Sequence, residues 1–465
     1  MASKNLKVFG WSIILALGGF LFGFDTAVIS GVEKSIQQLF NLSPFWHGFT
    51  ISSALIGTVA GALIAGKPAD KYGRKPILFI IAILFGLSAI GSALANSLPS
   101  FIIYRFLGGI GVGASSVVAP MYISEISPAK VRGRMTALFQ FNVIFGILMA
   151  YISNYLLSGM GDLSWRWMLG VMGIPAVAYF FLLFLVPESP RFLVKIGKID
   201  QARLVLEKIE TQNIALEIAE IKLSMMQKKE NLFSGRYSKP IAIAFLVAMF
   251  NQFSGINALL YYAPRIFELT GLSAADSMFQ PVLIGITNGI FTILGLVIID
   301  RVGRKKLLIV GSIGMSVCLG LVARSFYLEE FAGYELLIFL VGYIMFFAFS
   351  TGAVIWVLIS EVFPNSVRGQ GQSLGSFTHW LFAAIITFLF PVVAEEYKFG
   401  SGHAFAFFSV MMIVQAIVVW KYFPETKGKT LEELGIELSG DKALAVGFDD
   451  PDVPNVPPTV RTGRN

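Results

Sequence analysis

The sequence offers little that could cross-link the chain or hold a metal ion. Cys318 is the single cysteine, which excludes an internal disulfide and any cysteine-based metal cluster. The three histidines, His47, His379 and His403, lie too far apart in sequence to form a metal-binding motif. We therefore expect neither a metal site nor another cofactor.

Charge is scarce as well. Charged residues make up 14% of the 465 positions, whereas soluble domains carry about 25%. Hydrophobic residues reach 55%, and the mean hydropathy is +0.72. A chain of this composition could not cover itself with polar surface, so we expect it to be surrounded by a lipid bilayer.

The few charges leave twelve long windows that contain none. Each window holds about 17 residues or more, which is enough for one helix to cross a hydrocarbon core of roughly 30 Å. The pattern predicts an all-α membrane protein with twelve transmembrane helices. The windows are residues 8–24, 48–66, 76–104, 106–124, 135–161, 167–187, 240–264, 277–299, 307–323, 336–360, 369–394 and 404–420.

The loops between the windows alternate in charge. Basic residues such as Lys71, Arg132 and Arg304 fall on one side, and the loops of the other side are poor in them. Basic loops stay in the cytoplasm, so both termini are expected there, in a protein that crosses the cell (inner) membrane many times. The net charge of +7 is mostly this orientation signal, and we expect no nucleic-acid partner.

Four segments follow from the distribution of charge. We predict an N-terminal six-helix half at 1–190 and a C-terminal half at 239–430. Between them, 191–238 is charged with apolar residues at helical spacing, which indicates amphipathic cytoplasmic linker helices. The segment 431–465 is rich in Asp, Pro and Gly and is expected to be a largely disordered cytoplasmic tail.

The two halves repeat each other at an offset of about 230–237 residues. Asp-Lys-Tyr-Gly-Arg-Lys at 70–75 returns as Asp-Arg-Val-Gly-Arg-Lys at 300–305. The segment 125–133 returns at 361–369, and Pro-Glu-Ser at 187–189 returns as Pro-Glu-Thr at 424–426. Six plus six helices related by a pseudo-twofold repeat predict substrate held between the halves near the midplane.

These motifs resemble those of the sugar porter family of the major facilitator superfamily. Gly255-Ile256-Asn257, followed by Tyr261-Tyr262, adds to the likeness, which spans roughly residues 8–435. Within the family the chain is most similar to bacterial proton-coupled xylose, galactose and arabinose symporters. The resemblance implies transport by alternating access and no catalytic residue.

Opposite charges gather at the predicted cytoplasmic helix ends. They could lock the two halves together on the inner side, a gating role that the resemblance also implies. The alternative is a set of topology anchors that bind lipid headgroups. The residues are Asp70, Arg74, Glu125, Arg132, Glu188 and Arg191, with Asp300, Arg304, Glu361, Arg368 and Glu425 in the second half.

Two opposite charges lie inside the predicted membrane segments at equal depth. Asp25 and Arg105 both fall roughly 10 Å inside the outer surface, at 1.5 Å per residue. Burying charge in lipid is costly, so both residues are functional candidates. A carboxylate that loses its arginine partner in a buried site takes up a proton, which would provide proton coupling. The alternative is a static pair that joins the first and fourth helices.

A monosaccharide site needs donor–acceptor side chains and an aromatic face. Seventh-helix candidates are Asn251, Gln252, Asn257 and Tyr261, and Gly255 would permit local unwinding. Other helices supply Asn288, Trp356, His379 and Trp380. The resemblance transfers the family's sugar contacts onto Gln252, Asn257, Asn288 and Trp356. The alternative for each polar residue is a hydrogen bond that only joins helices.

The chain departs from the family pattern at several of these positions. His379 stands where symporter relatives usually carry an amide; it could bind sugar or simply pack between helices. Asn251 replaces the first Gln of the usual pair. Ile147 stands where xylose carriers have Gln, and Ala383 stands where Asn is common.

We predict a monomeric secondary active transporter that imports a hexose or pentose together with a proton. A passive uniporter is the alternative, and a non-transporting sugar sensor is disfavoured by the short tail. The sequence contains neither a nucleophile paired with a general base nor a nucleotide-binding loop, so we do not expect an enzyme.

Overall fold

The computed structural model describes residues 2–128, 131–209, 213–226, 230–269, 271–331, 334–364 and 366–429, with the short stretches 433–434 and 437–438. Within these residues the regular secondary structure is entirely helical, with no strand. Twelve helical segments within them are long and apolar enough to cross a membrane. The predicted number of transmembrane helices is therefore confirmed.

Six of these segments form the N-terminal half. Short elements join them: η1 (Ile29–Gly31), α2 (Glu33–Leu39), α4 (Gly66–Tyr72) and η2 (Gly161–Leu163). The spanning helices are α1 (Ala2–Val28), α3 (Pro44–Ile64), α5 (Arg74–Leu94), α6 (Leu98–Glu125) and α7 (Arg132–Leu157), and a sixth span made of α8 (Ser164–Gly170), α9 (Gly173–Leu182) and η3 (Leu183–Leu185).

The other six segments form the C-terminal half, and two of them are broken. The seventh span consists of α13 (Ser238–Phe253) and α14 (Ile256–Glu268), and the tenth of α17 (Glu335–Phe349) and α18 (Thr351–Glu361). The continuous spans are α15 (Ala274–Val302), α16 (Arg304–Leu328), α19 (Arg368–Glu396) and α20 (Gly400–Tyr422).

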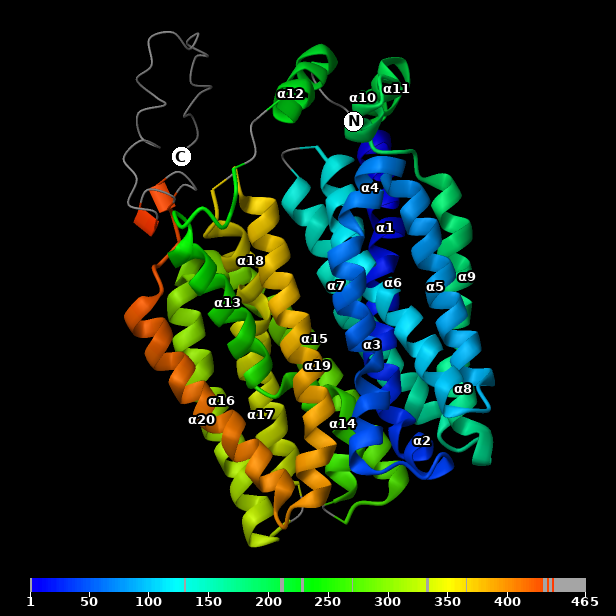
Figure 1. Ribbon diagram of the computed structural model, residues 1–465, viewed down its shortest axis with the longest axis vertical. Helices are drawn as coiled ribbons and strands as arrows, with labels where there is room; N and C mark the ends of the chain where they lie inside the picture. The colour runs from blue at the N-terminus through cyan, green and yellow to red at the C-terminus, as the bar shows by residue number, and fades with distance from the viewer. Residues whose placement is uncertain are drawn as a thin grey trace.

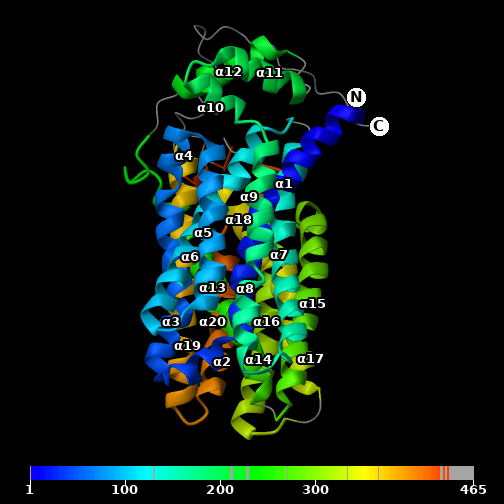
Figure 2. The same cartoon turned by 90° about the vertical axis from the view of Figure 1, so that its right-hand side faces the viewer.

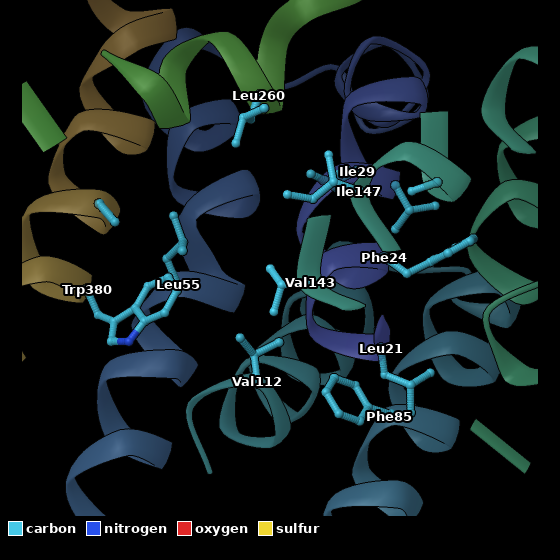
Figure 3. Packing of buried hydrophobic residues seen from close by; sticks show 14 of the residues in the cluster. Leu21, Phe24, Ile29, Leu55, Phe85, Val112, Val143, Ile147, Leu260 and Trp380 are labelled. Carbon is cyan, nitrogen blue, oxygen red and sulfur yellow. The ribbon is translucent and has the colours of Figure 1, made fainter. Parts of the chain in front are cut away.

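The two halves lie side by side as separate bundles (Figure 1). Helix α3 of the first half packs along α19 of the second, and α7 packs along α15. Trp380 of α19 lies beside Leu55 of α3, in the middle of this interface (Figure 3). The core therefore continues from one half into the other.

Close helix packing inside the N-terminal half depends on glycine. A Cβ atom at Gly109 or Gly113 of α6 would collide with the backbone carbonyl oxygens of Ala54 or Thr58 on α3. Because backbone atoms cannot move aside as a side chain can, only glycine allows this approach.

Three short helices lie outside the bundles: α10 (Pro190–Lys195), α11 (Ile199–Ile209) and α12 (Ile214–Met226). They cover the end of the molecule where α1 begins (Figure 2). We call this end the linker end and the opposite end the distal end. The predicted disordered tail, 431–465, falls outside the described residues except at 433–434 and 437–438.

At the linker end of the N-terminal half, one arginine joins three helices. The Arg74 guanidinium makes a bidentate ion pair with Glu125, with Nε–Oε2 and Nη2–Oε1 distances of 2.9 Å each. Asp70 lies 3.2 Å from Arg74 Nη2. Glu188 accepts from the backbone N–H groups of Arg74 at 3.2 Å and of Ser189 at 2.7 Å. Burial raises the pKa of Glu188, and these N–H donors oppose the rise.

The C-terminal half repeats this network. Arg304 Nη2 lies 2.7 Å from Glu361, and its Nη1 lies 2.9 Å from Asp300. Glu425 accepts from the Arg304 backbone N–H at 3.0 Å. The repeated sequence motifs therefore make equivalent hydrogen bonds and ion pairs in the two halves.

The Arg74 and Arg304 ion pairs each link residues of one half, so these two networks hold together the helices of their own bundles. That the cytoplasmic charges also lock the halves together stays a prediction. Three of the predicted gate residues stand at helix starts: Arg132 begins α7, Arg191 is the second residue of α10, and Arg368 begins α19.

The two networks differ in burial, which predicts unequal costs of breaking them. The Glu125 side chain is 5% exposed and the Glu361 side chain 22%. Arg74→Gln should destabilise the protein by about 3–5 kcal/mol, because it leaves a buried carboxylate unpaired. Arg304→Gln should cost about 1–3 kcal/mol.

Thermal unfolding of both variants in detergent measures this difference. Lys71→Gln, which removes an exposed cation at the same end, is the control and should leave the midpoint close to the unmodified value. Equal midpoints for the two arginine variants would contradict the burial argument.

Candidate functional site

The seventh span is interrupted where the sequence predicts unwinding. Helix α13 ends at Phe253, Gly255 has φ +82°, and α14 begins at Ile256. A left-handed φ of this kind suits glycine because it has no Cβ. The break turns two amide residues toward each other: Asn257 Nδ2 donates to Gln252 Oε1 at 2.8 Å.

Gln252 is the centre of a buried polar cluster. Its Nε2 donates to Asn251 Oδ1 at 2.9 Å and lies 3.2 Å from His379 Nδ1 and 3.3 Å from His379 Nε2. Because the amide N–H can only donate, the imidazole nitrogen that faces it accepts. That pairing requires the neutral form of His379.

Two indole rings enclose the imidazole. The Trp356 and Trp380 ring centroids lie 4.9 Å and 4.7 Å from that of His379. Trp380 Nε1 is buried and forms no hydrogen bond to any described residue. A buried donor without a partner is costly, so this N–H is available to a ligand hydroxyl. Aromatic faces beside amides are what a sugar requires.

The structure leaves two predicted sugar contacts apart from this cluster. Asn288 is buried in α15 and accepts from Thr292 of the same helix at 3.4 Å. Tyr261 is buried in α14, which packs against α1, the helix that carries Asp25. Among the described residues, no recorded hydrogen bond connects Asn288 or Tyr261 to Gln252.

Ile147, where the family resemblance implies an amide, packs in the apolar core of the N-terminal half. It is 6% exposed and lies among buried apolar side chains that include Phe24, Ile29 and Val143 (Figure 3).

Two residues that the sequence motifs did not indicate reach across the interface. The Phe22 ring lies 5.4 Å from that of Trp380, and the Tyr151 hydroxyl donates to the Leu260 carbonyl at 3.0 Å. Phe22 lies one helical turn before Asp25, which could have indicated it. No pattern in the sequence distinguishes Tyr151.

Asp25 and Arg105 form the buried ion pair that their depth predicts. Arg105 Nη1 lies 2.7 Å from Asp25 Oδ1, and Nη2 donates to the Asp25 carbonyl at 3.2 Å. Both side chains are 2% exposed. Gly108 lets α6 approach Ser88 of α5 beside this pair, because a Cβ there would collide with the Ser88 hydroxyl oxygen. In such a site an unpaired charge is strongly unfavourable, so separation of the pair favours protonation of the carboxylate.

Comparisons with known proteins agree with this architecture. A family model described as "Sugar (and other) transporter" matches residues 11–438. The chain is 37% identical to the D-xylose-proton symporter of Escherichia coli, over 92% of this chain and 95% of that protein. It is also 37% identical to the arabinose-proton symporter of Bacillus subtilis, over 91% and 93%.

Solved structures give the same result. The inward open conformation of the Escherichia coli xylose transporter superposes with a TM-score of 0.82, at 36% identity over 92% of this chain and 99% of that one. A proton:xylose symporter bound to 6-bromo-6-deoxy-D-glucose gives 0.77, at 36% identity over 94% and 100%. The chain therefore belongs to the sugar transporter family of the major facilitator superfamily, and it is a multi-pass membrane transport protein and not an enzyme.

Proposed function

We propose that this protein imports a monosaccharide together with a proton by alternating access. The observation that carries the proposal is the buried Asp25–Arg105 pair in a chain whose relatives include xylose-proton and arabinose-proton symporters. The linker end faces the cytoplasm, with both termini there, in the inner membrane of a bacterial-type cell. The transporter works as a monomer.

The Asp25–Arg105 pair acts as the proton switch. While Arg105 bonds to Asp25, the carboxylate keeps its charge. When Arg105 moves away, Asp25 is left in an apolar site and binds a proton, which removes the unpaired charge. One charge moving through 100 mV contributes about 2.3 kcal/mol, enough for roughly fifty-fold accumulation of sugar.

The sugar binds at the polar cluster. Gln252, Asn257 and His379 pair with ring hydroxyls, and Trp356 and Trp380 cover the apolar faces of the ring. Asn251 orients Gln252, while Asn288 and Tyr261 line the approach. The buried hydrogen bonds among these residues support a pre-organised site.

Asp25→Asn should abolish uphill sugar uptake, because asparagine cannot take up the transported proton. Sugar binding and counterflow exchange should persist, since the polar cluster lies on other helices. Uptake by proteoliposomes with and without a pH gradient measures both. Intact accumulation would eliminate coupling through Asp25, and a wild-type protein indifferent to the gradient would indicate a uniporter.

Gln252→Ala should weaken sugar binding roughly ten- to a hundred-fold, because a buried hydroxyl that loses its partner costs about 1–3 kcal/mol. Calorimetry with a panel of pentoses and hexoses measures the change. Gln280→Ala is the matched control, since Gln280 is a buried amide of α15 outside the cluster. Equal affinities for both variants would move the site elsewhere.

His379→Gln tests the residue in which this chain differs most from the family pattern. The imidazole is enclosed by two indole rings and faces the Gln252 N–H, so it stays neutral and sugar affinity should be flat between about pH 5 and 8. Glutamine should keep this flat profile but change the ranking of sugars, because its amide places a donor and an acceptor at other positions. Equilibrium binding in an Asp25→Asn background isolates the effect. Identical rankings would make His379 a packing residue.

A further inference from the structure

Four charged or titratable side chains meet between the halves at the distal end. Glu33 begins α2, His47 lies in α3, Arg265 in α14, and Glu395 near the end of α19. His47 Nε2 lies 2.9 Å from Glu33 Oε2, and Arg265 Nη1 lies 3.1 Å from the same oxygen. Arg265 Nη2 lies 3.0 Å from Glu395 Oε1. His47 Nδ1 lies 3.6 Å from Glu395 Oε1 and 3.4 Å from Arg265 Nη1.

This cluster joins the two halves, whereas the networks of the linker end do not. Glu33 and His47 belong to the N-terminal half, and Arg265 and Glu395 to the C-terminal half. Two further bonds cross beside it: Gln37 donates to Glu395 at 2.9 Å, and Lys34 pairs with Glu268. The distal end is thus held closed by ionic bonds in a conformation that superposes well on an inward open transporter.

The cluster is buried on the side of the N-terminal half. The His47 side chain is 0% exposed and that of Glu33 is 1%, while Arg265 and Glu395 are 22% and 23% exposed. The Tyr262 ring of α14 lies 5.8 Å from that of His47 and covers it. Charges buried to this extent persist only when they are paired.

The net charge of this cluster indicates the protonation state of His47. Glu33 and Glu395 carry two negative charges, and Arg265 carries one positive charge. The neighbouring Lys34–Glu268 pair is neutral in sum. The buried cluster is therefore neutral only when His47 carries a proton. Once the halves separate, these groups face water, where an imidazole has its ordinary pKa of about 6.5.

We propose that Glu33, His47, Arg265 and Glu395 form an outer latch, and that His47 takes up a proton when the latch closes. The inference rests on the proposed function for its place in a transport cycle. Acid on the outer side favours both protonation of Asp25 and closure of the latch, so the two events drive the carrier in the same direction.

The latch and the sugar cluster share a helix. Arg265 lies eight residues after Asn257 on α14, a distance of about 12 Å along the axis. Between them the helix is kinked at Tyr262, with φ −121° and ψ 17°, and its hydroxyl donates to the Thr387 carbonyl of α19 at 3.0 Å. Movement of α14 toward bound sugar therefore also moves Arg265 relative to Glu33.

A distance measurement across the distal end tests the proposal. Spin labels at Ser97→Cys and Glu330→Cys, in a Cys318→Ser and Asp25→Asn background without sugar, report opening in lipid nanodiscs. From pH 8 to 5.5 we expect the ratio of open to closed populations to fall about five- to tenfold. His47→Gln should raise the open fraction and abolish the pH dependence.

Glu395 lies at the partly exposed edge of the latch, and Glu395→Gln should raise the ratio of open to closed populations by a similar factor. This variant replaces His47→Gln if the latter does not fold. Glu396→Gln is the control: it removes a negative charge from the next residue of α19 and should leave the ratio unchanged. Distributions unchanged by both latch variants would overturn the latch. Opening with the pH dependence intact would overturn the role of His47. Because the assay uses neither sugar nor coupled transport, its outcome is independent of the Asp25→Asn uptake experiment.

Discussion

A charge inside an apolar bundle must keep a partner, and this constraint organises the whole structure. Only 14% of the chain is charged, so its helices can pack against one another and against lipid, but each buried carboxylate fixes the position of an arginine or histidine. Asp25 holds Arg105 between α1 and α6, and Glu33 holds His47 and Arg265 between the halves. Movement of a bundle is then coupled to protonation, because a separated pair must either find another partner or change its charge.

Two kinds of ionic network result, and they have different consequences. The Arg74 and Arg304 networks each lie within one half, so they can persist while the bundles rotate and make each half a rigid body. The cluster around His47 crosses the interface and must break when the distal end opens. A bistable carrier needs both kinds, since rigid halves without a breakable contact would have no defined states.

Much of this could be predicted from the sequence, for physical reasons. Charge-free windows predict spanning helices because a helix satisfies its own backbone hydrogen bonds in lipid. The equal depth of Asp25 and Arg105 predicted their ion pair. Gly255 predicted the break of the seventh span. The cluster of Glu33, His47, Arg265 and Glu395 was missed because its members lie at the ends of windows up to 362 residues apart, where they resemble ordinary loop charges. The sequence repeat also did not reveal that Arg74 and Arg304 pair with carboxylates of their own halves. Repeated motifs are compatible with pairing within a half and with pairing between the halves.

The described contacts divide the chemistry between the bundles. The Asp25–Arg105 pair lies in the N-terminal half, and the amides and imidazole lie in the C-terminal half. Coupling must therefore pass through the interface. Among the described residues, the Phe22 ring contacts Trp380, the Tyr151 hydroxyl donates to the Leu260 carbonyl, and α14 packs against α1. Leu260 belongs to α14, which begins directly after the break at Gly255. A short helix freed from α13 by that break can follow the sugar without distorting the rest of its bundle, and its packing against α1 brings the displacement to the helix that carries Asp25.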